Sequence, residues 1–247
     1  MKRTGKRVGL ALGGGGIRGL SHIGVLKVLE QEGIDIDLIV GTSAGALIGG
    51  AYAGGQSPRE IQTRLEAYLR SPEFDATALK SIGLAVSPEQ RGRLRKAESL
   101  FMKRYYMIRS FFRPSLLPAG EFHSLINFFL PEMDIRQTRI PFRAVTTDLI
   151  TGRQVVLSEG NLRTAVLASC AVPGAVEPVP SGERLLADGG ITSLVPVHAT
   201  REAGADIVIA VTVDRDLTST GNMETAQEIF YRAGEITASR LGAVELE

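Results

Sequence analysis

The stretch IDLIVGTSAGALIGGAYAGG, residues 36–55, decides the fold that the rest of the chain must follow. It begins with an apolar run at residues 38–40, whose length and branching are typical of a buried strand. A tight turn then leads into small and apolar residues without polar alternation, the pattern of a helix buried on all sides. Gly41 and Gly45 flank Ser43, where a side chain would crowd a strand-to-helix turn. The pattern predicts a nucleophile elbow that raises the Ser43 hydroxyl above the sheet edge. The alternative is a serine that only caps a buried helix.

Length and composition limit the classes of protein. A chain of 247 residues with 44% hydrophobic and 22% charged residues suits one large α/β domain. The 28 Lys and Arg balance 27 Asp and Glu, so no global field favours a nucleic-acid partner. Cys170 is the only cysteine, which excludes an internal disulfide, and we expect it to be a small buried packing residue. No apolar run reaches the roughly 18 residues of a membrane span, and we expect a cytoplasmic protein.

A glycine loop precedes the elbow. An apolar run at residues 8–12 is followed by four glycines at 13–16, and apolar residues then recur at helical spacing until Gly33. Strand, loop, helix and strand make a βαβ unit, whose right-handed crossover places the two strands parallel. Backbone N–H groups of such a loop converge on an anion, either a pyrophosphate or an oxyanion.

The pyrophosphate interpretation remains the alternative. The loop matches the dinucleotide fingerprint as Gly14-x-Gly16-x-x-Gly19, and Asp35 or Asp37 lies near the expected distance downstream. However, the acidic residue of that fingerprint belongs at the C-terminal end of the second strand, and both aspartates precede the strand. The position of the aspartates therefore favours an oxyanion hole over a dinucleotide site.

The rest of the chain continues the α/β pattern. We expect a capped helix from residue 57, an apolar helix at 121–130, a hairpin at 142–158, a helix at 162–172 capped by Asn161, a strand at 184–187, a helix at 196–203, a strand at 206–214, and a last helix from Asn222 toward Leu241. Without repeats or linkers, we expect one domain over residues 1–247, with its motif-bearing core at about 6–213 and a helical cap insertion at about 72–135.

Residues 88–113 differ in character from the rest. Eight Lys and Arg face two acids there, and apolar and aromatic residues recur every three to four positions. A basic amphipathic helix of this kind suits peripheral contact with a membrane or an acidic partner. The alternative is a cap helix packed on the domain with its charges in solvent, which together with the next helix forms a mobile cover.

A serine hydroxyl needs a general base before it becomes a good nucleophile. His22 and His123 fit structural roles. His198 follows Asp188 in the chain order of a Ser–Asp–His triad and is the alternative base, but it opens a helix that leads away from the Asp188 turn. Asp188 follows a predicted strand and precedes two glycines, so its carboxylate is held in a tight turn. The simplest arrangement is a dyad in which Asp188 accepts the proton of Ser43. The alternative for Asp188 is a turn-forming residue without a catalytic role.

Three features together, the glycine loop with Arg18, the elbow around Ser43 and the Asp188-Gly-Gly turn, resemble the patatin-like phospholipase family, in particular its compact bacterial members. The resemblance covers about residues 6–213. It implies a three-layer α/β/α fold with a mainly parallel central sheet and a helical cap, and a Ser–Asp dyad that works without histidine.

Carried over by position, the resemblance implies that Ser43 is the nucleophile and Asp188 the base. It places the oxyanion hole at the backbone amides of Gly14, Gly15, Gly16 and Arg18.

The activity expected from this resemblance is a lipid acyl hydrolase with a lipid or acyl-ester substrate. We expect no cofactor or metal, because the sequence has no His/Cys cluster with ligand spacing and no acidic calcium loop. The alternatives are a dinucleotide-binding protein and a non-catalytic membrane-binding module that uses residues 88–113. The oligomeric state and the lipid class stay open at this point.

Overall fold

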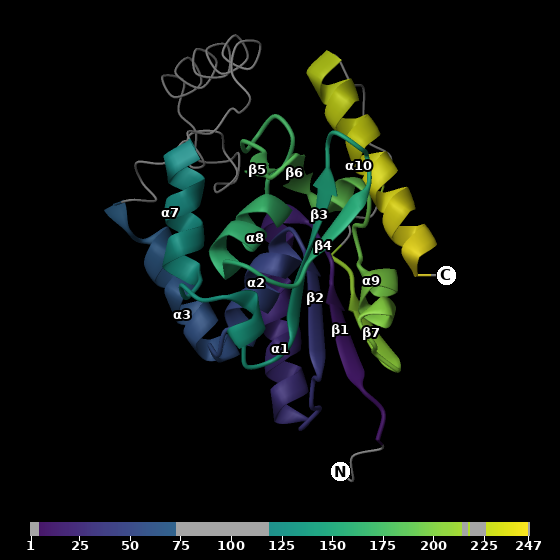
Figure 1. The fold of residues 1–247 in the computed structure, drawn as a ribbon. Helices are drawn as coiled ribbons and strands as arrows, with labels where there is room; N and C mark the ends of the chain where they lie inside the picture. The colour runs from purple at the N-terminus through teal and green to yellow at the C-terminus, as the bar shows by residue number, and fades with distance from the viewer. Residues whose placement is uncertain (1–4, 73–118, 214–216, 218–225, 247) are drawn as a thin grey trace.

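The computed structural model describes residues 5–72, 119–213, 217 and 226–246 (Figure 1). Within them the strands are β1 (Val8–Leu12), β2 (Leu38–Thr42), β3 (Phe142–Asp148), β4 (Gln154–Leu157), β5 (Val179–Ser181), β6 (Arg184–Asp188) and β7 (Ile207–Val211). The α-helices are α1 (His22–Gln31), α2 (Ala44–Ala53), α3 (Pro58–Leu69), α7 (Ala119–Phe129), α8 (Leu162–Ser169), α9 (Val197–Glu202) and α10 (Ala226–Glu245). Three 3₁₀-helices are η1 (Gly16–Ser21), η3 (Ile135–Gln137) and η4 (Gly189–Ile191).

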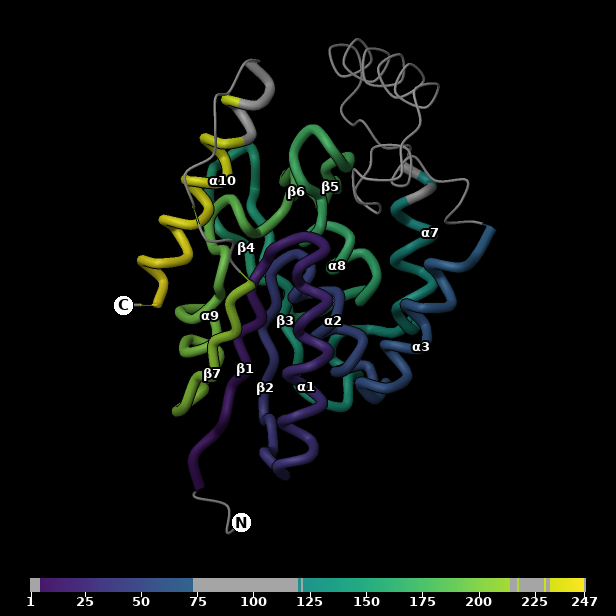
Figure 2. The backbone as a smooth tube through the Cα atoms, turned by 180° about the vertical axis from the view of Figure 1, so that it is seen from behind, coloured from purple at the N-terminus to yellow at the C-terminus, as the bar shows by residue number. Residues whose placement is uncertain are grey.

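Alternate residues of the central strands pack into different cores, which makes the fold three-layered. Leu10, Leu12 and Ile39 belong to the large cluster that includes residues of α1, α2 and α8. Ala11 instead packs with residues at the start of α9, and Val40 packs with residues later in the same helix. Because successive side chains of a strand point to opposite faces, helices cover both faces of the sheet. Figure 2 shows the same division from behind, with α9 and α10 on one side of the sheet and α1, α2 and α8 on the other. The expected α/β/α fold is confirmed.

The centre of the sheet is parallel and one side of it is not. Strands β7, β1, β2 and β3 run parallel to one another, whereas β4 and β6 pair antiparallel with β3, and β5 pairs antiparallel with β6. The predicted βαβ unit and the predicted hairpin are therefore both present. Strand β5 carries no recognisable strand signal in the sequence, because it has three residues and one of them is a proline.

Strands β2 and β6 meet end to end along the same side of β3. The last residue of β2, Thr42, is paired with Val145, and the last residue of β6, Asp188, is paired with the next residue, Thr146. Strand β4 occupies the other side of β3 at both positions. Since β6 runs opposite to β2, the residues that end these strands face each other about 3.3 Å apart along β3. This register brings the elbow and the aspartate turn together.

The helices also follow the sequence closely. Helix α2 is buried along nearly its whole length, and α3 begins with the expected capping box at Ser57. Helix α8 ends at Ser169, earlier than expected, with Asn161 as its cap. Helix α10 continues to Glu245, beyond the predicted end near Leu241.

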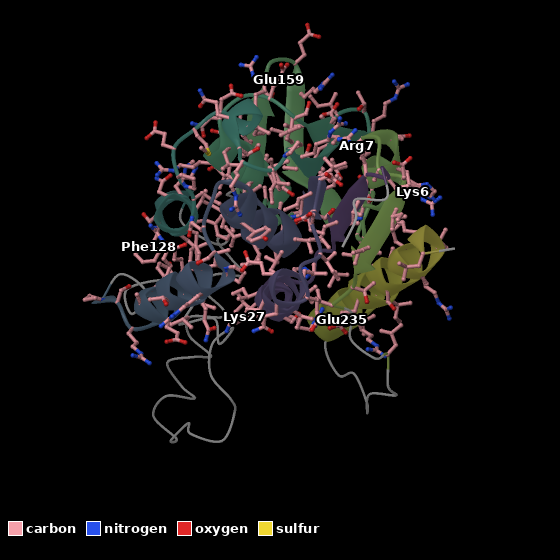
Figure 3. All side chains as sticks on the ribbon, turned by 90° about the horizontal axis from the view of Figure 1, so that it is seen from below. Lys6, Arg7, Lys27, Phe128, Glu159 and Glu235 are labelled. Carbon is pink, nitrogen blue, oxygen red and sulfur yellow. The ribbon has the colours of Figure 1, made fainter. Side chains whose placement is uncertain are left out.

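Two expectations lie mainly outside the described residues. They are the basic segment 88–113, with most of the cap at 72–135, and the cap residue Asn222. Among the described side chains, Lys27 of α1 and Glu235 of α10 lie at the periphery of the molecule (Figure 3).

Candidate active site

Ser43 sits in a backbone conformation that side chains seldom adopt. Its φ is 53° and its ψ is −121°, and it is the one non-glycine residue with positive φ among those that the structure describes. Such conformations cost about 1–3 kcal/mol and persist where the surrounding structure imposes them. Ser43 stands between β2 and α2, at 9% exposure, as the N-cap of α2. Its side chain does not bond to the helix that it precedes, so the hydroxyl is not used as a cap.

The turn at Ser43 depends on close contact between backbones. A Cβ atom at Gly45 would lie 2.1 Å from the Leu12 carbonyl oxygen, at the end of β1. A Cβ atom at Gly41 would lie 2.5 Å from the Cα of Ala46. Both distances are far below van der Waals contact, so the elbow requires glycine at these two positions.

Ser169 fixes the elbow from the side, a role that the sequence analysis missed. Its hydroxyl accepts a hydrogen bond from the Ser43 N–H at 2.9 Å and donates one to the Val145 carbonyl at 2.6 Å. Ser169 is the last residue of α8 and is fully buried. The hydroxyl therefore connects the backbone of Ser43 to β3.

Asp188 is a buried carboxylic acid with one oxygen unused. Its Oδ1 accepts a hydrogen bond from the Gly190 N–H at 2.7 Å, and its buried Oδ2 has no hydrogen-bond partner. Burial raises the pKa of Asp188 to about 6, while the nearby Ser43 hydroxyl and the Gly190 N–H act in the opposite direction. Asp188 as a whole residue is 6% exposed. A buried acid with a free oxygen and a pKa near 6 is suited to accepting a proton at neutral pH.

Cys170 lies beside both members of the pair. Burial raises the pKa of its thiol well above the ordinary value, and the negative charge of Asp188 raises it further, whereas the nearby Ser43 hydroxyl acts in the opposite direction. The side chain is 5% exposed, and Cys170 is a free thiol. The expected buried packing residue is confirmed, and the raised pKa keeps the thiol protonated at neutral pH.

The first peptide of the glycine loop is held on both sides. The Gly13 N–H donates to the Val211 carbonyl at 3.0 Å, and the Gly14 N–H donates to the Leu194 carbonyl at 2.8 Å. The Gly13 carbonyl accepts a hydrogen bond from Nε2 of His22 at 2.8 Å, and since a carbonyl only accepts, Nε2 carries the hydrogen.

His22 is fully buried, and its Nδ1 has no partner. Burial lowers the pKa of His22, so the ring is neutral at pH 7 and serves as a fixed donor to the glycine loop. The sequence analysis expected only a local structural role for it.

The glycine loop continues into the 3₁₀-helix η1. Gly15 and Gly16 stand at the start of η1, where the first N–H groups of a helix lack intrahelical partners. Arg18 lies deeper in η1, and its Nε donates to the Val213 carbonyl at 3.0 Å. Its side chain therefore tethers the loop to the chain after β7.

The remaining candidates lie away from this pair or serve other contacts. The side chain of Asp37 accepts a hydrogen bond from the Val8 N–H at 2.9 Å, at the N-terminal ends of β1 and β2 and so at the other end of these strands from Ser43. Asp35 is exposed. His123 on α7 and His198 on α9 are both exposed. Among the described residues, no three His, Cys, Asp or Glu side chains group together as metal ligands would.

Comparison with known proteins shows which family the chain belongs to. The family model of the patatin-like phospholipases matches residues 10–201, which is more than half of the chain and includes the glycine loop, Ser43 and Asp188. The chain belongs to the patatin-like phospholipase family. An uncharacterised NTE family protein of Mycobacterium tuberculosis is 35% identical over 208 residues, which are 84% of this chain and 49% of that protein.

Other patatin-like relatives are much longer than this chain. The patatin-like phospholipase domain-containing protein 6 of mouse is 32% identical over 225 residues, which are 89% of this chain and 15% of that protein. This patatin-like chain thus spans about half of the length of the mycobacterial relative and a smaller part of the mouse protein. The crystal structure of VipD from Legionella pneumophila aligns with 75% of this chain at 15% identity and a TM-score of 0.41, covering 46% of that chain.

No helix in the described parts of the chain is both long and apolar enough to cross a bilayer.

Proposed function

We propose that the chain is a serine acyl hydrolase that cleaves lipid esters through Ser43 and Asp188. The observation that carries the proposal is the unused, buried Oδ2 of Asp188 next to a serine on a strained elbow. Membership in the patatin-like phospholipase family supports a lipid ester as the substrate class. We further propose that the ester belongs to a phospholipid or a lysophospholipid.

In the proposed reaction, Asp188 accepts the proton of the Ser43 hydroxyl as the serine oxygen bonds to the ester carbonyl carbon. The carbonyl π electrons move to its oxygen, which becomes the oxyanion. When the tetrahedral intermediate collapses, the C–O bond to the alcohol breaks, and the alcohol leaves with the proton from Asp188. Water then attacks the acyl-enzyme with Asp188 again as base, which releases the fatty acid and restores Ser43.

We assign the oxyanion donors to the amides of Gly15 and Gly16, with Arg18 as a tether. The Gly14 N–H is already bonded to Leu194, so Gly14 anchors the loop in this proposal instead of binding the oxyanion. Fixed donors aimed at a developing oxyanion are worth about 10²–10³ in rate for each donor. The proposed hydrolysis therefore depends on how firmly the loop is held.

The two alternatives have less support. A dinucleotide site needs an acid at the C-terminal end of β2, and Asp37 is bonded at the other end of the sheet. A membrane-binding module based on residues 88–113 lies outside the described residues. Peripheral membrane contact remains a proposal, and it does not replace the dyad.

The test is turnover of phospholipid and lysophospholipid in mixed micelles by wild type, Ser43→Ala and Asp188→Asn. Ser124→Ala is the control, because the exposed Ser124 hydroxyl donates a hydrogen bond to the backbone of its own helix at Gly120. We expect wild type and the control to release fatty acid, and we expect the rate of both dyad variants to be lower than that of wild type by a factor of at least about 10³. Equal rates in wild type and Ser43→Ala would refute the proposal.

A further inference from the structure

The last turn of α10 contributes a buried carboxylate to the loop that precedes α9. Glu245 is 9% exposed. One of its oxygens pairs with the Ser193 hydroxyl, and the other accepts the Val195 N–H at 2.8 Å. Among the described residues, Glu245 forms no ion pair with Lys or Arg. A buried carboxylate is costly unless it is hydrogen-bonded, so these two bonds fix Glu245 and the loop to each other.

Glu245 is hydrogen-bonded to residues 193–195, and the carbonyls of this segment bind two parts of the proposed active site, the glycine loop and the end of β2. The Leu194 carbonyl accepts the N–H of Gly14 at 2.8 Å. The Ser193 carbonyl accepts the hydroxyl of Thr42 at 3.0 Å, and Thr42 directly precedes the nucleophile. One short segment thus connects α10 to the glycine loop and to the end of β2.

The bond from Gly14 to Leu194 has a partner on the other side of the same peptide. His22 donates to the Gly13 carbonyl, while Leu194 accepts from the Gly14 N–H. A peptide unit is planar, so two bonds on its opposite edges set its tilt. The tilt of this peptide determines where the following amides, which we assign to the oxyanion, point.

We propose that Glu245 is a positioning residue of the hydrolase, which sets the glycine loop and the elbow through residues 193–195. This proposal rests on the proposed function, and it adds that α10 is part of the catalytic apparatus without touching substrate. Loss of the carboxylate makes residues 193–195 more mobile, which weakens the hydrogen bond from the Gly14 N–H to the Leu194 carbonyl. The amides of Gly15 and Gly16 are then no longer held in the direction of the oxyanion. Because the oxyanion forms only as the serine attacks, its donors act on the transition state, so the effect falls on kcat and much less on KM.

The chemistry of Glu245 supplies a conservative variant. In Glu245→Gln the amide oxygen can accept from the Val195 N–H, and the amide N–H₂ can donate to the Ser193 hydroxyl, which accepts as well as donates. Glu245→Gln therefore retains both bonds, whereas Glu245→Ala retains neither. Arg240→Gln is the matched control, since Arg240 is an exposed residue of the same helix.

The experiment measures two readouts on wild type and these three variants, below the unfolding temperature of each. The first is kcat and KM on a micellar phospholipid. The second is amide hydrogen exchange of peptides that cover residues 13–16 and 41–43, with α3 as the internal reference. For Glu245→Ala we expect kcat to fall about tenfold or more with KM within about twofold, and exchange at Gly14 to rise about tenfold. Glu245→Gln should stay within about threefold of wild type.

Should Glu245→Ala not fold, Ser193→Ala takes its place, because it removes one of the two bonds and leaves Val195 bonded. Unchanged exchange at Gly14 in the alanine variant overturns the positioning role, whether or not any ester is cleaved. Faster exchange with unchanged kcat also overturns it. Faster exchange in a protein whose wild type cleaves no ester instead refutes the proposed function and leaves the structural link intact.

Discussion

Removal of the Asp188 charge should stabilise the protein while it abolishes activity. Burial raises the pKa of Asp188 from an ordinary 3.8 to about 6. At about 1.36 kcal/mol for each pKa unit, the shift of about 2 units corresponds to about 3 kcal/mol that the folded state loses when the carboxyl ionises. Asp188→Asn keeps the acceptor for Gly190 and carries no charge, so at pH 8 its free energy of unfolding should exceed that of wild type by up to about 3 kcal/mol.

The sign of the pH dependence follows from the direction of this shift. The folded state holds the Asp188 proton more tightly than the unfolded state, so the wild type loses stability as the pH rises from about 4 to about 6. The advantage of Asp188→Asn should therefore be small at pH 4 and complete by pH 7. His22, whose pKa is lowered by burial, destabilises the fold on acidification, but it is present in both proteins and cancels from the difference.

The assay is urea unfolding of wild type and Asp188→Asn at one-unit steps from pH 4 to pH 8. For a chain of this size, about 3 kcal/mol also corresponds to roughly 6–12 °C in Tm. Asp35→Asn is the control, since Asp35 is exposed, and its stability should follow wild type at every pH. A difference between Asp188→Asn and wild type that does not change with pH would refute the view of Asp188 as a buried acid that ionises near pH 6.

Three further predictions follow from the site. The wild-type kcat/KM should fall about tenfold for each pH unit below about 6, because Asp188 must be ionised to accept a proton; a pH–rate profile over pH 4 to 8 measures this. Gly45→Ala should lower the yield of folded protein, since its Cβ would lie 2.1 Å from a carbonyl oxygen; soluble expression and thermal unfolding measure it. Ser169→Ala should cost about 1–3 kcal/mol in unfolding and lower kcat, because the buried Ser43 N–H loses its acceptor; urea unfolding and kinetics at pH 8 measure both.

Two of these predictions have a matched control variant. Gly24→Ala is the partner of Gly45→Ala, because a Cβ at Gly24 in α1 meets no atom within 4 Å and alanine favours a helix; equal Tm values for the two variants would contradict the elbow argument. Ser124→Ala is the control for Ser169→Ala, and equal kcat values for the two variants would contradict the role of the Ser169 hydroxyl in holding the Ser43 backbone. A wild-type rate that stays flat down to pH 4 would contradict Asp188 as the base.

The sequence predicted the local elements well because their signals are local. The glycines around Ser43, the capping box at Ser57 and the alternation of the hairpin each depend on the packing or hydrogen bonding of a few neighbouring residues. The apolar runs also predicted the parallel centre of the sheet, since a βαβ unit has one favoured hand.

The contacts that join distant parts of the chain were not predictable in this way. Nothing near Asp188 shows that β6 runs antiparallel to β3 and ends opposite the end of β2. Ser169 and Glu245 carry ordinary side chains on amphipathic helices, and their roles arise only when α8 and α10 dock on loops that are 50 or more residues away in the sequence. The resemblance placed Gly14 among the oxyanion donors, and only its bond to Leu194 points to a different use.

Covalent labelling with a fluorophosphonate reports directly on whether Ser43 is the nucleophile. We expect one added probe mass on the wild type, located at Ser43 by peptide mapping, and no labelling of Ser43→Ala. We also expect slower labelling of Asp188→Asn, because the serine proton loses its acceptor. Labelling at another residue, or a wild type that resists the probe at pH 8, would contradict the account.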